Sequence, residues 1–310
     1  MLKVFSYFIE PAVKDLMVEQ NIDSIKLRGG WFDYMTTRIK DNSMVIKEEI
    51  DSLLSLASKV SYIDNHPIFY IQPCKSLIGI DYKKPPTQLL KWLENYIKKS
   101  NYNVGLEYNK MVDENLEVLS IQKLQESVVN NSLSDSHRYL SNLIKVSNPY
   151  YIMEAIFEIS LSLTADKIIF CWFAYKCIRF MSSDSSVEML YICIDCLNNN
   201  KINKVISPKY ESFYLFCYMK QIIKSDMVRY NTIRPLLDKV LVSIDDFDIL
   251  EINIPNRLKE SLRKNGVYAI IDYIRTLKVN AFSIKELLML DALRVLIQYD
   301  DKSELIKKII

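Results

Sequence analysis

The sequence predicts a mainly α-helical protein with a small mixed α/β domain at its N-terminus. After Pro86, apolar residues recur at three- and four-residue spacing almost without a break, as helices with one buried face require. Before Pro86, helical spacing alternates with short runs of β-branched and aromatic residues. We therefore expect a mixed α/β domain over 1–84 and an all-helical domain over 85–310, built as a multi-helix bundle or an irregular α-solenoid.

The beginning of the first domain predicts a helix followed by a β-hairpin. Pro11 suits the first turn of a helix, because its missing N–H would be unpaired there anyway. Gly29-Gly30 then separates two short apolar segments, 24–28 and 31–35. Both glycines can take positive φ, which the tight turn of a two-residue hairpin requires.

The second half of this domain predicts one more helix and two strands. Apolar residues follow helical spacing over 50–60, while 67–71 and 76–80 are short runs rich in isoleucine and aromatic residues. Pro85-Pro86 follows and interrupts both helix and strand, so we place the domain boundary there.

The second domain contains recognisable helix ends. The expected helix starts are Asp135, Asn148-Pro149, Thr164, Ser207-Pro208, Arg234-Pro235, and two capping boxes, Ser185 with Glu188 and Ser283 with Glu286. Gly266 is an expected helix stop. The turns between these helices are short, which favours antiparallel packing of successive helices.

Composition favours a globular protein with no nucleotide cofactor. Hydrophobic residues make up 49% of the 310 residues, and 40 basic and 38 acidic side chains leave a net charge of +2. Such a balance creates no broad field for a polyanion, so a nucleic-acid role would depend on a local patch. The chain has five glycines and neither a Gly-Lys pair nor a G-x-G, so we expect no phosphate-binding loop and no cofactor.

The N-terminal residues, the six cysteines and the longest apolar run indicate the cellular compartment in which the protein is expected. The first ten residues lack the regions of a signal peptide, so we expect a cytoplasmic protein with reduced thiols packed as small hydrophobic groups. The apolar run 168–181 is interrupted by two cations and is too short to span a bilayer. The sequence therefore predicts no membrane span.

Cys193-Ile-Asp-Cys196 is the sharpest local motif. It can form a redox pair, or half of a zinc site that Cys171 and Cys177 complete. The motif lies inside an apolar helical segment and the other pair has the wrong spacing for a zinc knuckle. We therefore favour cysteines packed in the core and expect no metal.

No catalytic residue is predicted. The two histidines, His66 and His137, lie outside any known nucleophile or metalloprotease motif and are interpreted as turn or cap residues. The chain is accordingly expected not to be an enzyme. A catalytic site assembled from residues distant in sequence stays open as an alternative.

The segment 170–180 mixes aromatic and basic residues. Proteins that bind single-stranded nucleic acid combine such residues, with cations on the backbone and rings stacked on bases. The same composition is typical of a buried helix, on which Lys176 and Arg179 would share one polar edge. We favour the buried helix and keep Lys176 and Arg179 as candidates for a weak nucleic-acid contact.

Residues 10–86 resemble the N-terminal domain of the traffic ATPases that power type II and type IV secretion and type IV pili. The resemblance depends on the order of Pro11-Ala-Val-Lys-Asp-Leu-Met-Val18, Ser24-Ile-Lys-Leu-Arg-Gly-Gly-Trp31, the helix near 50–60 and His66-Pro-Ile-Phe before a proline linker. It covers a quarter of the chain and no catalytic residue. Everything after it departs from the family, which carries a nucleotide-binding motor domain there. The resemblance implies a non-hydrolysing relative or accessory of such a machine.

The leading functional hypothesis is a non-enzymatic cytoplasmic adaptor, scaffold or regulatory subunit that binds another protein through its helical surface. The alternative is a nucleic-acid-associated factor that uses the cations of 170–180. An enzyme with a dispersed site and a toxin or effector are the remaining classes. No small-molecule substrate is indicated.

Overall fold

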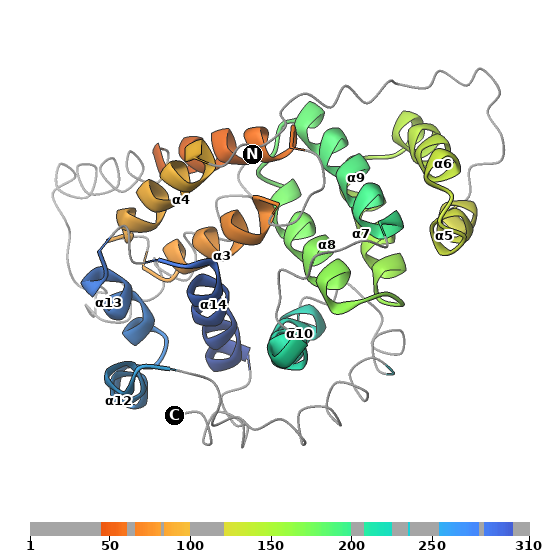
Figure 1. Cartoon of the computed structure of the whole chain (residues 1–310). Coiled ribbons are helices and arrows are strands. Elements are labelled where there is room, and N and C mark those ends of the chain that lie inside the picture. The colour runs from red at the N-terminus through yellow and green to blue at the C-terminus, as the bar shows by residue number, and fades with distance from the viewer. Residues whose placement is uncertain are drawn as a thin grey trace, which may run out of the picture.

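The computed structural model describes residues 45–60, 66–81, 84–99, 121–199, 208–224, 235, 254–278 and 282–299. Within these residues the chain forms twelve helices and no strand, which confirms the mainly α prediction (Figure 1). The predicted hairpin over 24–35 lies outside them. No helix among the described residues has both the length and the apolar character needed to cross a membrane.

After a first helix at 45–57, the helices follow in chain order. They are α3 (Ile68–Ile78), α4 (Thr87–Lys99), α5 (Ile121–Val129), α6 (Leu133–Val146), α7 (Pro149–Ser160), α8 (Ala165–Ile178), α9 (Ser183–Asn198), α10 (Pro208–Lys224), α12 (Asn256–Asn265), α13 (Tyr268–Thr276) and α14 (Ile284–Tyr299).

Helix α8 is the centre of the core. Every residue from Ala165 to Tyr175 is buried, and α8 packs against α3, α7, α9 and α10. A helix that is apolar on all sides keeps its side chains away from water only when every side of it is buried. The two charged residues of its first turn are also buried, and Lys167 Nζ donates a hydrogen bond of 2.7 Å to the Leu197 carbonyl at the end of α9.

Helices α7, α8 and α9 pack against one another, and turns of four residues connect them. A turn of this length returns the chain alongside the preceding helix, as the sequence predicts. The contacts of α8 with α3 and of α3 with α14 join parts of the chain that are far apart in sequence. A solenoid consists mainly of nearest-neighbour contacts, so these long-range contacts favour a bundle.

The strands predicted at 67–71 and 76–80 are wrong, because α3 covers Ile68–Ile78. A short apolar run has the same pattern in a buried strand and in a buried helix. A proline such as Pro73 is also unfavourable inside a helix, because it has no N–H to donate. The helix forms because its side chains fill the space between α8, α14 and α4. His66 precedes it and accepts a hydrogen bond of 3.2 Å from the Ile68 N–H at its Nδ1, so it takes part in the turn that leads into the helix, whose N-cap is Pro67.

Residues on both sides of Pro86 contribute to one hydrophobic core. Leu54 and Phe69 are buried in the same cluster as residues of α8 and α14. Tyr70 also lies edge to face with Tyr96 of α4, at a ring distance of 4.9 Å. The described part of 1–84 is therefore packed directly against the helices that follow.

Several predicted helix ends are confirmed. Asn148 Oδ1 accepts a hydrogen bond from the Tyr150 N–H, and the Ser283 hydroxyl accepts one from the Glu286 N–H. α12 ends at Gly266 with φ of 54°.

Two predicted starts are displaced by three residues. α6 begins after Ser132 and not at Asp135. α9 begins after Ser182 and not at Ser185. The Ser182 hydroxyl accepts a hydrogen bond from the Ser185 N–H, so Ser182 is the N-cap in place of the predicted Ser185.

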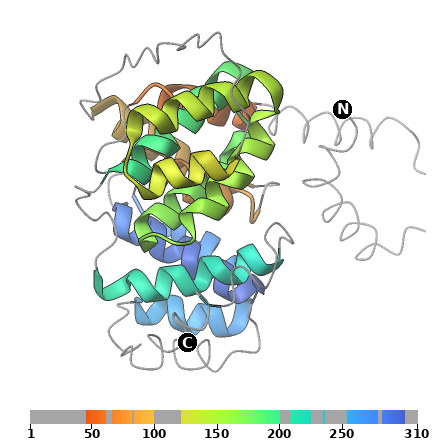
Figure 2. The same cartoon turned by 90° about the vertical axis from the view of Figure 1, so that its right-hand side faces the viewer.

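Helices α5 and α6 form one edge of the molecule, and α12 and α13 lie near the opposite edge (Figure 1). The view turned by 90° shows 121–198 together in the upper half and α10 with the C-terminal helices below (Figure 2). α5 packs against α6 and α9, so one side of it faces the body of the protein and the other faces solvent.

Candidate functional site

The exposed apolar side chains concentrate on one part of the described chain. Seven large hydrophobic residues in the described ranges are exposed, and five of them lie within 121–151. These five are Ile121, Val129, Leu133, Val146 and Tyr151, which are 42 to 65% exposed. The other two are Val45 and Tyr268. Scattered exposed apolar residues are ordinary, but a concentration on neighbouring elements marks a candidate interaction surface.

Helix α5 has two distinct faces. Leu124, Ser127 and Val128 are buried against α6 and α9. The opposite side, here called the α5 outer face, consists of Ile121, Gln122, Gln125, Glu126, Val129 and Asn130, all of them exposed. The three- and four-residue spacing within each set places the two sets on opposite sides of the helix.

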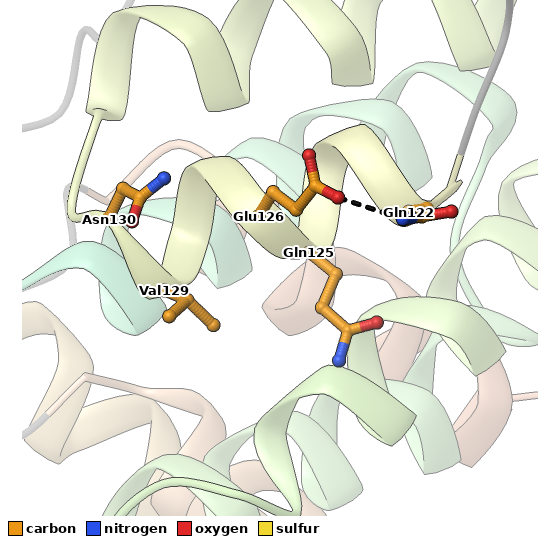
Figure 3. A pocket seen from close by; sticks show the side chains of 5 residues that line it. All are labelled: Gln122, Gln125, Glu126, Val129 and Asn130. Carbon is orange, nitrogen blue, oxygen red and sulfur yellow. Dashed lines mark hydrogen bonds between the residues drawn. The ribbon is translucent and has the colours of Figure 1, made fainter.

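The α5 outer face contains a shallow depression of about 330 Å³. It is lined by Gln122, Gln125, Glu126, Val129 and Asn130 (Figure 3). Gln122 Nε2 donates a hydrogen bond of 2.8 Å to Glu126 Oε1, so the single carboxylate of this face is engaged along the helix. What remains is aliphatic surface with neutral amides, a composition typical of the centre of protein–protein interfaces, where charge is depleted.

The turn between α5 and α6 holds the outer face in a fixed position. Asn131 has φ of 54°, the left-handed conformation that asparagine tolerates better than most residues. The Asn131 N–H donates to the Val128 carbonyl at 3.0 Å, and the Ser132 N–H donates to the Ser127 carbonyl at 2.9 Å. These two bonds form a Schellman motif, which satisfies the free carbonyls at the end of α5.

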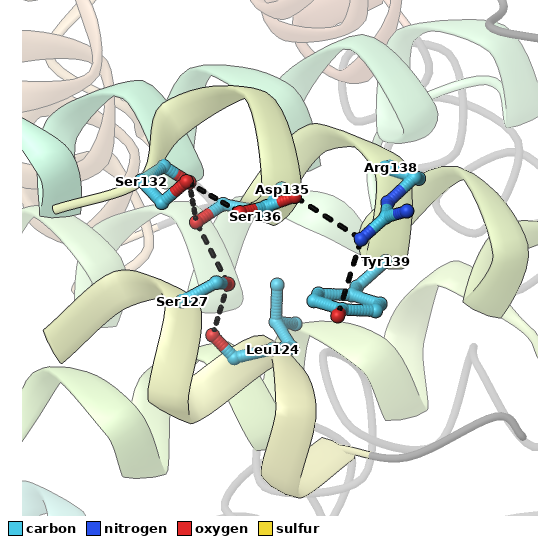
Figure 4. A network of polar contacts seen from close by, with 7 residues as sticks. All are labelled: Leu124, Ser127, Ser132, Asp135, Ser136, Arg138 and Tyr139. Carbon is cyan, nitrogen blue, oxygen red and sulfur yellow. Dashed lines mark hydrogen bonds and ion pairs between the residues drawn. The ribbon is translucent and has the colours of Figure 1, made fainter. Parts of the chain in front are cut away.

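A polar network continues from this turn into α6 (Figure 4). The Ser127 and Ser136 hydroxyls lie 2.9 Å apart, and Ser136 donates to the Ser132 carbonyl at 2.8 Å. Asn198 Nδ2 of α9 donates to the Ser136 hydroxyl at 3.3 Å. Buried hydroxyl groups with complete partners rigidify the packing around them, so α5 is fixed to both α6 and α9.

An outer branch of the network lies nearer to solvent. The Ser132 hydroxyl donates to Asp135 at 2.7 Å, and Arg138 forms an ion pair of 3.1 Å with the same carboxylate (Figure 4). Arg138 also lies over the Tyr139 ring, 5.0 Å from its centroid. An exposed pair of this kind contributes at most about 1 kcal/mol, so the branch orients side chains more than it stabilises the fold.

A histidine–aspartate pair joins α6 to α9. His137 Nε2 lies 2.7 Å from Asp195 Oδ1, and the His137 ring meets the Tyr191 ring edge to face at 5.3 Å. The sequence assigned His137 only to a helix start. The two partners are 58 residues apart, and no local pattern connects them.

The candidate residues Lys176 and Arg179 lie at the end of α8, away from the α5 outer face. Lys176 is half-buried, with its Nζ 5.6 Å from the centroid of the Trp172 ring. Arg179 is exposed and lies over the Tyr150 ring at 4.2 Å. Four of the five aromatic rings of the segment 170–180 are buried, and Phe180 is half-buried. Trp172 is 1% exposed, so it offers no face on which a base can stack.

Cys193 and Cys196 are fully buried in α9, as the core interpretation predicts. The Cys193 thiol lies 3.8 Å from the Met153 sulfur of α7. All six cysteines of the chain lie in the described residues, where they are buried and form no disulfide. Within the described residues, no group of three or more histidine, cysteine or acidic side chains has the arrangement of a metal site.

The α5 outer face was not predicted from the sequence. Its only sequence signal is the mixture of amides and aliphatic residues at positions where a surface helix normally carries charge, as in Gln122, Gln125 and Val129. A comparison of the chain with models of protein families, with curated proteins and with solved structures finds no match.

Proposed function

We propose that this protein is a non-enzymatic cytoplasmic adaptor or regulatory subunit that binds another protein through the α5 outer face. The observation that carries the proposal is the concentration of exposed apolar side chains on 121–151, together with a depression on the same segment whose lining contains one carboxylate, Glu126, among neutral side chains. The matching partner surface is an uncharged, largely apolar segment that offers hydrogen-bond groups to Gln122 and Gln125. Six cysteines without a disulfide agree with a reducing compartment.

The rigidity of the site supports a binding role. A surface that is already ordered loses little conformational entropy when a partner docks. The Schellman motif at Asn131 and the buried hydroxyl contact between Ser127 and Ser136 hold α5 before any partner arrives. One form of this role is an accessory of a secretion or pilus machine, as the resemblance of residues 10–86 implies.

Site-specific photo-cross-linking in the native host tests the proposal. A photoreactive side chain at Gln125, one of the residues that line the depression, is expected to capture one defined protein, whereas the same side chain at Lys91 of α4 captures none. Val129→Asp should abolish the Gln125 cross-link because it places a charge at the centre of the interface. Tyr268→Asp is the matched control, since the two side chains are 59 and 55% exposed.

The proposal fails if the Gln125 probe captures no protein, or captures the same set of proteins as the Lys91 probe. It also fails if Val129→Asp and Tyr268→Asp reduce the cross-link equally. The thermal midpoint of each variant is measured alongside, so that a loss of fold is recognised separately.

The alternative, association with nucleic acid through Lys176 and Arg179, has weaker support. The Trp172 ring beside Lys176 is buried, and Arg179 already lies over the half-buried Tyr150 ring. If this alternative holds, affinity for single-stranded nucleic acid falls steeply with salt and is lost in Arg179→Ala.

A further inference from the structure

Helices α12 and α13 form a part of the surface that lies outside the sites described above. The two helices pack against each other near the edge of the molecule opposite α5 and α6 (Figure 1). In α12 only Leu258 and Leu262 are buried, so one narrow stripe holds the helix on the protein. Most of the circumference of α12 therefore faces solvent.

The solvent side of α12 carries four cations and one carboxylate. The cations, called the α12 basic face below, are Arg257, Lys259, Arg263 and Lys264, and the carboxylate is Glu260. Lys259 is half-buried and the other four side chains are exposed. The whole chain has a net charge of only +2, so four cations against one carboxylate on a helix of 10 residues are a local concentration of positive charge. Such a patch attracts anionic partners even when the protein as a whole is nearly neutral.

The stability of the helix explains only two of these cations. Arg263 and Lys264 lie in the last turn, where positive charge is favourable because the helix dipole is negative at this end. Arg257 lies in the first turn, which contains no acidic residue, and a cation there opposes the dipole. Within the described ranges, no carboxylate forms an ion pair with Arg257, Lys259 or Lys264. The cations of the first half of the helix therefore contribute little to the fold.

The helix arranges the four cations in two rows. Arg257 and Lys264 are seven residues apart, so they share one side of α12 and lie about 10 Å from each other along its axis. Lys259 and Arg263 are four residues apart and share the other side. Glu260 lies between the two rows and offsets only one of the four charges. Rows of exposed cations on a convex helix suit a linear polyanion, whereas a small ligand needs a concave site.

The exposed groups of this surface favour nucleic acid over an anionic membrane. A helix that lies on a bilayer inserts an apolar face, but the only apolar residues of α12 are Leu258 and Leu262, which are buried. Tyr268 begins α13, just beyond the turn at Gly266, and is 55% exposed. Proteins that bind single-stranded nucleic acid combine cations for the backbone with aromatic rings for the bases.

We propose that the α12 basic face binds the phosphate backbone of single-stranded nucleic acid without sequence preference, and that Tyr268 stacks on a base. Each lysine or arginine that contacts a phosphate releases counterions, so three or four such contacts give measurable binding at low salt. The surface is separate from Lys176 and Arg179, and from the α5 outer face. The inference goes beyond the proposed function and does not depend on it.

Fluorescence anisotropy of the full-length protein with a labelled oligo(dT) strand tests the proposal. The logarithm of the binding constant is expected to fall with the logarithm of the salt concentration with a slope of about −2 to −3, as three or four phosphate contacts to a single strand predict. In the double variant Arg257→Gln/Lys264→Gln this slope should become shallower by about 1.4, because two contacts are lost. Tyr268→Ala should weaken binding to the single strand about fivefold or more and leave binding to a duplex of the same length almost unchanged.

Lys47→Gln/Lys59→Gln is the matched control, because it removes two positive charges from exposed lysines near the two ends of the first helix. This variant should keep both the affinity and the salt slope of the unmodified protein. The thermal midpoints of all variants are compared, and exposed side chains such as Arg257 and Lys264 should leave them unchanged. The proposal is overturned if the protein does not bind the strand at low salt, or if the two double variants lose affinity equally. Binding to vesicles that contain phosphatidylserine, without binding to the oligonucleotide, would overturn it in favour of a membrane surface.

Discussion

Arg294 and Asp291 form an ion pair inside α14, with Nε 2.7 Å from Oδ1 and the two residues only 5 and 1% exposed. Tyr218 of α10 donates its hydroxyl to the other carboxylate oxygen at 3.0 Å. The pair thus joins α14 to α10 through two residues, Asp291 and Tyr218, that are 73 positions apart in the sequence. Burial raises the pKa of Asp291, while the adjacent guanidinium acts in the opposite direction and favours the ionised form.

Asp291→Asn is expected to lower the free energy of unfolding by about 3–5 kcal/mol, because it leaves the Arg294 guanidinium buried without a counter-charge. Tyr218→Phe should cost less, about 1–3 kcal/mol, since it removes one hydrogen bond to a charged group. Urea denaturation at pH 7 measures both values. A larger loss for Tyr218→Phe would contradict the assignment of Asp291 as the centre of this network.

The stability of the protein should fall as the pH is lowered from 6.5 to about 4, partly because of His66. Its Nδ1 accepts the Ile68 N–H and its Nε2 faces the Val60 carbonyl at 3.3 Å, an arrangement that requires the neutral ring. Complete burial lowers the pKa of His66 to about 4. The unfolded chain therefore binds a proton in this range that the folded chain does not, and stability rises with pH.

The size of this effect is on the order of 3 kcal/mol between pH 7 and pH 4, from the shift of the pKa below its ordinary value. Carboxylates also titrate in this interval, so the comparison is with His66→Asn, whose stability should depend less on pH. Equal pH dependence of the two proteins between 4 and 6.5 would show that His66 is not buried in its neutral form.

Asn131→Val is expected to destabilise the protein by about 1–2 kcal/mol, because a β-branched residue is strained at φ of 54°. Asn131→Gly should be neutral or slightly stabilising, since glycine takes this conformation without strain. Thermal denaturation of the two variants separates them, and hydrogen exchange should show faster opening of α5 in Asn131→Val alone. Similar losses in both variants would rule out the Schellman motif as the cause.

The six thiols should react slowly in the native protein and completely after denaturation. All six are buried, and burial raises the pKa of Cys171 and Cys177, which keeps these groups in the unreactive thiol form. Titration with a disulfide reagent, with and without urea, counts them. Rapid reaction of two thiols in the native state, or stoichiometric zinc in the purified protein, would restore the metal or redox interpretation of Cys193 and Cys196.

Helix ends with local hydrogen-bond signals were predictable from the sequence. Asn148, Ser283 and Gly266 act at or beside the positions that their chemistry predicts, because a cap depends on the backbone within three or four residues. The shifted start of α9 has a tertiary cause as well as a local one. Glu188, the expected partner in the capping box, accepts a hydrogen bond of 2.6 Å from Ser58 instead.

Long-range pairs were not predictable from a single sequence. No spacing rule connects His137 with Asp195, or Lys75 with the carbonyl of Lys176 a hundred residues later. α3 was predicted as strands for a related reason, since its neighbours α8 and α14 decide the conformation of an apolar run that fits either element.

The packing of α3 on α14 has a consequence for the protein as it emerges from the ribosome. About 200 residues separate the two helices, so at typical elongation rates α3 waits roughly 10–40 s for its partner to be synthesised. During that interval the side of α3 that α14 will cover, which includes some of its isoleucine and aromatic side chains, has no permanent neighbour. We therefore expect the nascent chain to expose an apolar segment at α3 until α14, the last helix in the described residues, packs against it.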